Sequence, residues 1–166
     1  GRARVIILAL DLSGQLGWAV GRKGGFPDHC TVMLAGGMKA QRGCNSACCD
    51  AIADLITDHA VTDVVFERQM EISHRTVKRW QNTTGLIELI GVARLVATKR
   101  GMRSFRPIAA LTARAETMGN GRADKGDVVQ WCRDQGWNPG TEHAADALLL
   151  LAHAHGLRAA RWRKAA

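Results

Sequence analysis

The strongest constraint on the fold comes from two short apolar runs separated by a helical pattern. Val5 to Leu10 ends at Asp11, and a second run, Thr62 to Glu67, also ends in an acid. Between them, residues 44–59 place apolar side chains about every 3.6 residues, the period of an amphipathic helix. Buried strands joined through a helix usually lie parallel in one sheet, because the chain must cross back over it. The sequence therefore predicts an α/β domain.

Turn residues divide the rest of the chain into further short elements. We expect strands at 5–11, 15–22, 30–35, 62–67 and 102–106, and helices at 44–59, 76–100, 108–117, 125–135 and 142–160. The second helix should start loosely around 82–85, and Pro107 should stop the last strand. The first three strands form a meander and the later two are reached through helices. We therefore expect residues 1–166 to form one domain with a mixed five-stranded sheet.

Charge indicates the class of partner. The chain has 23 Lys and Arg against 15 Asp and Glu, a formal net charge of +8. Such a basic chain is typical of proteins that bind polyanions, nucleic acid first. The odd number of cysteines, 5, favours reduced thiols. No run approaches the roughly 18 apolar residues of a membrane span. We expect a cytoplasmic protein of a bacterial or phage-infected cell, with an organelle matrix left open, and no membrane partner.

Four chemically notable side chains stand at positions that the predicted fold brings together. Asp11 and Glu67 end neighbouring parallel strands, whose carboxyl ends share one edge of the sheet. His143 and Asp146 are three residues apart and so share a helix face. Each acid alone has an ordinary interpretation, as a turn residue, a strand end or, for Glu142, a helix start. An Asp one turn inside an apolar helix does not fit that interpretation.

The convergence of these groups predicts a metal-dependent nuclease. Clustered carboxylates repel one another unless a divalent cation joins them, and oxygen ligands favour Mg²⁺ or Mn²⁺. Two such ions about 3.5–4 Å apart support in-line phosphoryl transfer, while the surrounding positive charge holds a nucleic-acid backbone. No small-molecule cofactor is expected. A non-cleaving nucleic-acid-binding module is the alternative, although a pure binder would bind phosphate better without these acids.

Three segments in this order resemble the RuvC-type Holliday junction resolvases, particularly their phage-like branch: VIILALDLSGQLGWAV, DVVFERQ and EHAADALLLLAHA. The resemblance extends over nearly the whole chain. It implies a ribonuclease H-like fold and a homodimer that nicks four-way DNA junctions in pairs during recombination and repair, using Mg²⁺ or Mn²⁺. It also implies that Asp11, Glu67, His143 and Asp146 bind the metal and catalyse the reaction. Many relatives have Asp at the position of His143, which leaves open whether the imidazole is a ligand or transfers a proton.

The same resemblance nominates a lysine. GRADKGDVVQW resembles the family segment whose Lys contacts the phosphate at the active site, which implies a catalytic role for Lys125. The alternative is an exposed lysine at a helix start, where its charge opposes the helix dipole. A related nuclease that acts on RNA or on flap substrates is the nearest enzymatic alternative.

Basic and apolar clusters supply the remaining candidates. The expected nucleic-acid contacts are Arg68, His74, Arg75, Lys78, Arg79, Trp80 and Lys125. Helix residues Ile87, Ile90, Gly91 and Arg94 form a face that suits an isologous dimer contact, with packing on the protein's own sheet as the alternative. Cys44, Cys48 and Cys49 are interpreted as core residues rather than zinc ligands, because no second Cys/His pair follows at zinc-finger spacing.

Overall fold

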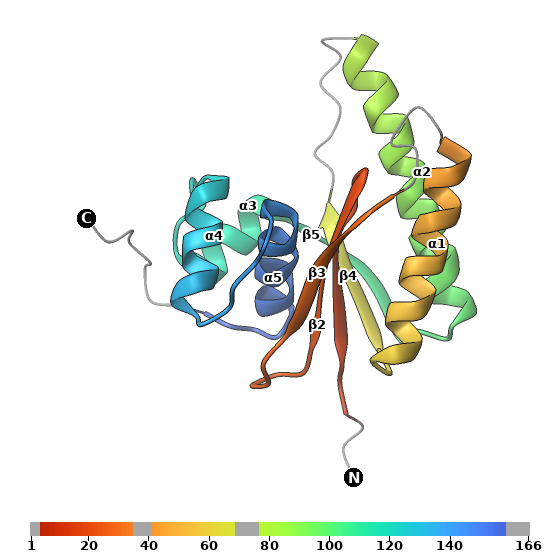
Figure 1. Ribbon diagram of the computed structural model, residues 1–166. Coiled ribbons are helices and arrows are strands. Elements are labelled where there is room, and N and C mark those ends of the chain that lie inside the picture. The colour runs from red at the N-terminus through yellow and green to blue at the C-terminus, as the bar shows by residue number, and fades with distance from the viewer. Residues whose placement is uncertain (1–3, 35–40, 69–76, 159–166) are drawn as a thin grey trace.

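The computed structural model describes residues 4–34, 41–68 and 77–158 of the chain, without the side chains of residues 41–43 and 77–83. Its strands are β1 (Ile7–Asp11), β2 (Gln15–Gly21), β3 (Asp28–Met33), β4 (Asp63–Arg68) and β5 (Ser104–Ala109). They form one sheet in the order β3-β2-β1-β4-β5 (Figure 1). β1, β2 and β3 pair antiparallel, whereas β4 is parallel to both β1 and β5. The expected mixed five-stranded sheet is confirmed.

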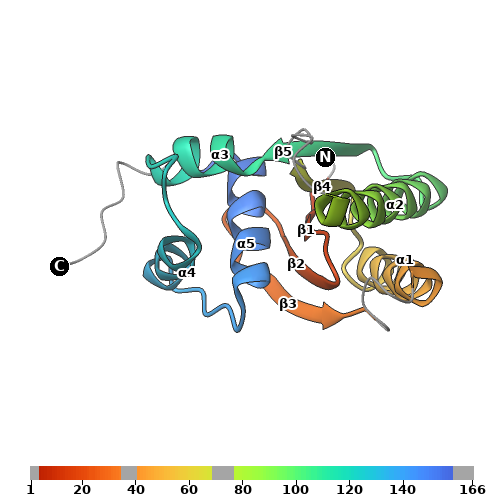
Figure 2. The ribbon, with the colours of Figure 1, turned by 90° about the horizontal axis from the view of Figure 1, so that it is seen from above.

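Helices cover both faces of this sheet. They are α1 (Gln41–Asp58), α2 (Val77–Lys99), α3 (Ala110–Ala113), which continues into the π-helical turn η2 (Arg114–Met118), α4 (Lys125–Asp134) and α5 (Glu142–Ala154). Viewed from above, α1 and α2 lie on one side of the sheet, and α5 lies against the other side with α4 outside it (Figure 2). The central strands are therefore covered on both faces.

This layering explains the unbroken apolar run of β1. Leu8 and Leu10 belong to a core cluster with α1 and α2, whereas Ile7 and Ala9 belong to a cluster with α4 and α5. A strand buried on both faces needs apolar side chains at every position rather than at alternate ones. The first polar residue after the run is Asp11, at the point where β1 ends.

The fifth strand differs from the prediction. We expected Pro107 to end it, but β5 continues through Pro107 to Ala109. β5 is an edge strand, and an edge strand tolerates the missing backbone N–H of proline because one of its sides has no partner. The third strand was also expected two residues too late, since it spans Asp28–Met33 rather than 30–35.

Two helices also differ from their predicted ranges. α2 is helical without a break through residues 82–85. α5 ends at Ala154 rather than at 160, because Gly156 adopts a left-handed backbone with φ 76°. The N–H of Leu157 donates to the Ala152 carbonyl, which completes a helix-ending turn. Within the described ranges, none of the helices is long and apolar enough to cross a membrane.

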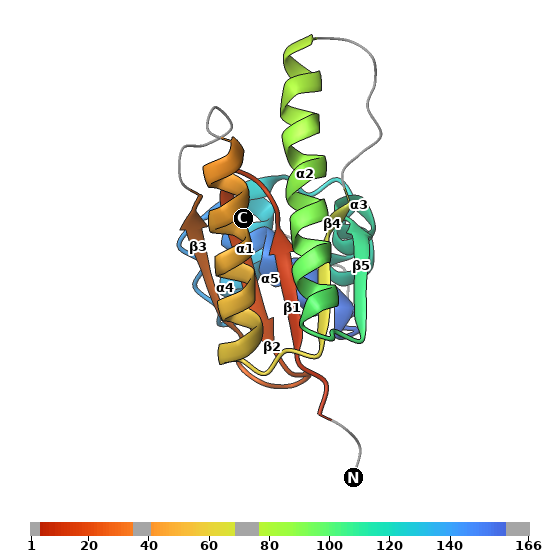
Figure 3. The same cartoon turned by 90° about the vertical axis from the view of Figure 1, so that its right-hand side faces the viewer.

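The N-terminal part of α2 reaches beyond the sheet at one end of the molecule. The first turns of α2 project past the sheet at the end where β1 finishes (Figures 1 and 3). Because β4 is parallel to β1, both strands point their carboxyl ends toward this projecting helix. Asp11 and Glu67, which the sequence predicts as metal ligands, belong to this end.

Candidate metal centre

Three carboxylates meet where β1 and β4 end. Oxygen atoms of Asp11, Glu67 and Asp146 all lie within 4.8 Å of one another. The register of the parallel pair explains the first two, because Leu10 is paired with Phe66 and the next residue on each strand is an acid. Asp146 comes from the first turns of α5, which packs against these strands. The structure therefore brings together three of the four residues as the sequence predicts.

A glycine allows α5 to approach the sheet so closely. Gly17 is paired with Asp11 in the β1–β2 ladder. A Cβ atom at Gly17 would lie 2.2 Å from the backbone carbonyl oxygen of His143, far inside van der Waals contact. The Thr141 hydroxyl caps α5 by accepting a hydrogen bond from the Ala144 N–H at 3.1 Å. Gly17 and the cap together position the start of α5, and with it His143 and Asp146.

His143 lies beside the three carboxylates rather than among them. Its Nδ1 is 2.7 Å from Oδ2 of Asp11, and about a quarter of the side chain, 27%, is exposed. An ionised carboxylate only accepts hydrogen bonds, so Nδ1–H donates to Asp11 and Nε2 remains for another partner. The sequence predicts that His143 binds metal together with the three acids. In the structure, His143 contacts these acids through its hydrogen bond to Asp11.

The clustered acids are electrostatically costly. Burial raises the pKa of Glu67 to about 7, helped by the charges of Asp11 and Asp146 and opposed by Arg114. Burial and Asp11 also raise the pKa of Asp146 to about 6, although Lys125, Arg114 and His143 oppose this shift. Three such acids cannot all ionise cheaply near neutral pH unless a cation compensates them. The donor set consists of hard carboxylate oxygens, which suit a divalent cation such as Mg²⁺ or Mn²⁺.

Arg114 is a neighbour of the cluster that the sequence analysis did not single out. It begins the π-helical turn η2, and one terminal guanidinium nitrogen is 3.9 Å from Oδ1 of Asp146. Its Nε is buried and has no hydrogen-bond partner among the described residues. The side chain as a whole is 22% exposed, and a partly exposed guanidinium can hold an anionic oxygen through its terminal nitrogens. The only signal in the sequence was an Arg between two alanines, which is too common to be informative.

Lys125 occupies the first turn of α4, behind a capping box formed by Asp124 and Asp127. The side chain is exposed, and Nζ lies 3.7 Å from Oε2 of Glu142 at the start of α5. Lys125 is an exposed lysine at a helix start, and it lies near enough to lower the pKa of Asp146. Its contact with phosphate stays a prediction.

The predicted nucleic-acid contacts fall into three groups. Arg68 is exposed at the last position of β4, directly after Glu67. Lys78, Arg79 and Trp80 belong to the projecting first turns of α2. His74 and Arg75 lie outside the described residues.

The predicted dimer face is divided. Of its residues, Ile87 is 58% exposed, whereas Ile90 packs against the core cluster under α2. Leu95, which was not part of the predicted face, is 57% exposed on the same helix. Arg94 extends over the ring of Phe105, with 5.3 Å from the guanidinium carbon to the ring centroid. Packing on the protein's own sheet therefore accounts for Ile90 but not for Ile87.

Three of the five cysteines lie in the interior, whereas Cys49 is partly buried and Cys30 is exposed. Cys44 and Cys48 are fully buried in the core cluster with α1, as expected for packing residues. In the described parts of the chain, the carboxylate cluster is the one group with metal-binding geometry. Trp131 is completely buried and Trp18 is partly buried against the core.

Comparisons with known proteins agree with this fold. The sequence matches no protein-family model and no curated protein. The structure matches that of RuvC from Thermus thermophilus with a TM-score of 0.69 and 17% identity, over 91% of this chain and 94% of that one. RuvC of T. thermophilus in complex with a Holliday junction substrate matches with a TM-score of 0.75 and 18% identity, over 92% and 94% of the two chains.

A eukaryotic protein shares the same architecture. The yeast mitochondrial Holliday junction resolvase Ydc2 matches with a TM-score of 0.61 and 13% identity, over 90% of this chain and 77% of that one. The fold that the sequence resemblance implied is thus confirmed over nearly all of the chain. This protein has the ribonuclease H-like fold of the RuvC-type Holliday junction resolvases.

Proposed function

We propose that this protein is a metal-dependent endonuclease that resolves four-way DNA junctions by paired nicks. The observation that carries the proposal is the convergence of Asp11, Glu67 and Asp146 at one rim of a RuvC-like sheet. A chain with net charge +8 gains nothing in DNA affinity from three clustered acids. Their presence is explained if they bind cations that act on the phosphodiester.

The acids would share the work of holding metal. Asp11, Glu67 and Asp146 supply oxygen ligands, and a bound pair of ions would activate water and stabilise the leaving oxygen. His143 orients Asp11 through the 2.7 Å hydrogen bond, which leaves Nε2 free to bind metal or to accept a proton from water. Both roles stay open for His143.

Two cations flank the carboxylates and would act on the phosphate. Arg114 lies on the η2 side of Asp146, and Lys125 lies on the α4 side beside Glu142. Each is placed to balance negative charge that develops on the scissile phosphate. Arg68 and the basic first turns of α2 would hold the DNA backbone farther out.

The proposed substrate requires two cutting sites. A four-way junction has two-fold symmetry, and its resolution needs two matched nicks, which a homodimer supplies. The exposed apolar side chains of Ile87 and Leu95 on α2 are the surface that we propose for the second copy. Light scattering should detect a dimer at micromolar concentration, and a strict monomer that makes uncoupled nicks would contradict this part of the proposal.

A cleavage panel tests the function. Purified protein is incubated with labelled four-way junction, duplex, flap and RNA–DNA hybrid, each with Mg²⁺, Mn²⁺ or EDTA. We expect paired nicks in the junction with either metal and none in EDTA. Asp11→Asn should bind the junction as tightly as the wild type or more tightly, because it removes one repulsive charge, and should cut at least about a thousandfold more slowly.

The other outcomes identify the alternatives. Preferential cutting of flap or hybrid would make the protein a related nuclease with another substrate. Tight junction binding without cutting in any metal would make it a binding module. Cutting by Asp11→Asn within about tenfold of the wild-type rate would remove Asp11 from the metal ligands.

A further inference from the structure

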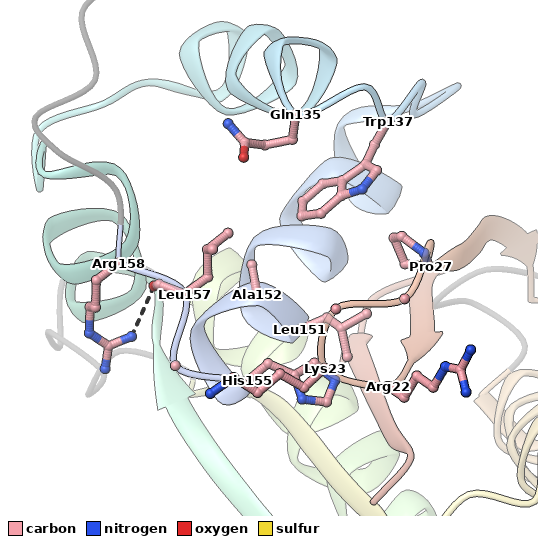
Figure 4. A pocket seen from close by; sticks show the side chains of 13 residues that line it. Arg22, Lys23, Pro27, Gln135, Trp137, Leu151, Ala152, His155, Leu157 and Arg158 are labelled. Carbon is pink, nitrogen blue, oxygen red and sulfur yellow. Dashed lines mark hydrogen bonds between the residues drawn. The ribbon is translucent and has the colours of Figure 1, made fainter.

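A pocket lies at the far end of α5 from the carboxylates. Its volume is about 540 Å³, and it opens between the turn that joins β2 to β3 and the C-terminal end of α5 (Figure 4). Leu151 and Ala152 of α5 form part of its wall. Asp146 and His155 are separated by about 13 Å of helix at a rise of about 1.5 Å per residue, so the two sites do not overlap.

The wall of the pocket is apolar and firmly supported. Trp137 points its ring into the space between α4 and α5 (Figure 4). Behind it, the fully buried Trp131 packs edge-on at 5.6 Å between ring centroids. Pro27 and Leu157 complete the apolar lining. A wall supported in this way stays open, because the Trp137 ring cannot collapse inward without losing its contact with Trp131.

The mouth of the pocket is positively charged. Arg22 and Lys23 come from the β2–β3 turn, and among the described residues that line the pocket none is Asp or Glu. Within the described parts of the chain, neither Arg22 nor Lys23 forms an ion pair, whereas Arg158 is paired with Glu116 at 3.0 Å. His155 donates from Nε2 to the Gly21 carbonyl at 3.0 Å, and burial lowers its pKa, with Lys23 adding to this effect. Lys23 is therefore the cation left for direct contact with a ligand, whereas the guanidinium of Arg22 points away from Trp137 and adds positive charge only at the edge of the pocket (Figure 4).

These features select the chemistry of the occupant. An apolar floor favours an aliphatic or phenyl side chain, whereas a nucleobase would leave its edge donors and acceptors without partners. Among the described residues of the lining, Gln135, His155 and the indole N–H of Trp137 are the uncharged polar groups, and His155 already uses one nitrogen. The chain's own residues 159–166 carry Arg161, Arg163 and Lys164, which have the same charge as the mouth.

We propose that this pocket binds an acidic segment of a partner protein, which inserts one large apolar side chain beside Trp137 and places a carboxylate against Lys23. The volume lies within the range of about 300–1,000 Å³ that suits a buried ligand group. Apolar insertion supplies the affinity, and the charges at the mouth supply the selection for acidic partners. The inference is independent of cleavage, since the pocket shares no side chain with the carboxylate cluster.

Peptide binding tests the proposal directly. The probe is a fluorescein-labelled peptide of Asp and Glu residues around a central Phe-Leu pair, followed by fluorescence anisotropy with the full chain. We expect a micromolar Kd, with a loss of about tenfold or more when Phe-Leu becomes Ala-Ala or when the acids become Asn and Gln. A peptide with benzoylphenylalanine at the Phe position should cross-link to residues 22–27, 135–137 or 151–158.

Protein variants distinguish peptide binding in the pocket from attraction by the overall positive charge of the protein. Arg22→Glu combined with Lys23→Glu should weaken peptide binding by about tenfold or more, because it reverses the charge of Lys23 at the mouth and of Arg22 at the edge of the pocket. Lys99→Glu, on the exposed last turn of α2, is the matched control and should bind as the wild type does. Trp137→Ala should also weaken binding, and if it fails to fold, the double charge reversal still decides the question.

Several results would overturn the proposal. They are equal binding of the Ala-Ala peptide, unchanged binding by the double variant, or displacement of the peptide by single-stranded oligothymidylate in a manner that depends on Arg22 and Lys23. The double variant should also cut a four-way junction at the wild-type rate, and a loss of about tenfold or more would place the pocket on the DNA path. If the wild type cuts nothing but binds the peptide, the proposed function fails and this inference stands.

Discussion

The N-terminal end of α5 carries Asp146 into a group of buried carboxylates, whereas its C-terminal end borders a pocket with two unpaired cations. Both ends lie on the same face of the sheet and belong to one helix of 13 residues. The carboxylates at one end are negative, and the basic side chains at the other end are positive. At each end, neighbouring groups of the same sign repel one another. Like charges gathered at one place cost free energy unless a ligand of opposite sign compensates them. The comparison therefore indicates a cation at one end and an anion at the other.

Among variants that leave the three carboxylates in place, the largest expected effect comes from moving α5 away from the sheet. Gly17→Ala should reduce junction cutting by about a hundredfold or more, because a Cβ there would clash with the His143 backbone and displace Asp146. Overpacking should also lower the free energy of unfolding by about 1–3 kcal/mol. Gly14→Ala is the matched control, since a Cβ at Gly14 would meet nothing within 4 Å. Single-turnover cleavage and urea unfolding measure both effects, and equal behaviour of the two variants would contradict this account of α5.

Arg114 tests whether the acidic end needs the partly buried cation beside Asp146. Arg114→Ala should slow cutting by about a hundredfold with little loss of junction affinity, because the guanidinium would act on the charge that develops at the phosphate. Arg114→Lys should restore part of the rate. Arg122→Ala, an exposed arginine in the following loop, should cut normally. If Arg114→Ala lowered affinity and rate equally, Arg114 would serve only ground-state binding.

Variants of His143 can distinguish a metal ligand from a group that transfers a proton. His143→Ala should slow cutting by about tenfold, because Asp11 loses its hydrogen bond. If Nε2 binds metal, His143→Asp should keep Mg²⁺-dependent cutting and show a weaker preference for Mn²⁺, which suits imidazole better than Mg²⁺ does. If His143 moves a proton instead, Asp should not rescue. Rates of both variants in each metal, compared with the wild type, distinguish these roles, and wild-type rates throughout would exclude both.

The smallest expected effect is a pH dependence of stability at the acidic end. Without metal, the pKa of Glu67 is raised from 4.5 to about 7, so the folded protein binds a proton that the unfolded chain releases. The stability from this proton is complete below about pH 4.5 and is lost as the pH rises through about 7. Urea unfolding in EDTA should therefore show a lower free energy of unfolding at pH 8 than at pH 5. Glu67→Gln should flatten this difference, and an unchanged slope in Glu67→Gln would assign the effect to other groups.

Much of the acidic end could be predicted from the sequence because it depends on local patterns. The apolar runs that end at Asp11 and Glu67 indicate strands buried on both faces, and the intervening helix makes them parallel. Parallel neighbours end at the same rim, so two acids at strand ends must lie close together. Asp146 follows from its place on the apolar face of a helix that has to pack on this sheet.

The remaining features depend on distances that no local pattern contains. Arg114 reaches Asp146 because the chain makes a π-helical turn after β5, and an arginine between alanines does not indicate such a turn. The pocket joins residues 22–27 to residues 151–158, which are far apart in the chain, so neither segment alone reveals it. In the sequence, Gly17 looks like an ordinary glycine near a turn. Only the structure shows that any Cβ at this position would clash with the backbone of His143 in α5. The sequence by itself determined the order of elements and the acids at the strand ends, because burial and periodicity act locally. Only the tertiary structure decided which cations and which glycine lie beside these acids, and where the pocket forms. These features depend on how whole elements pack.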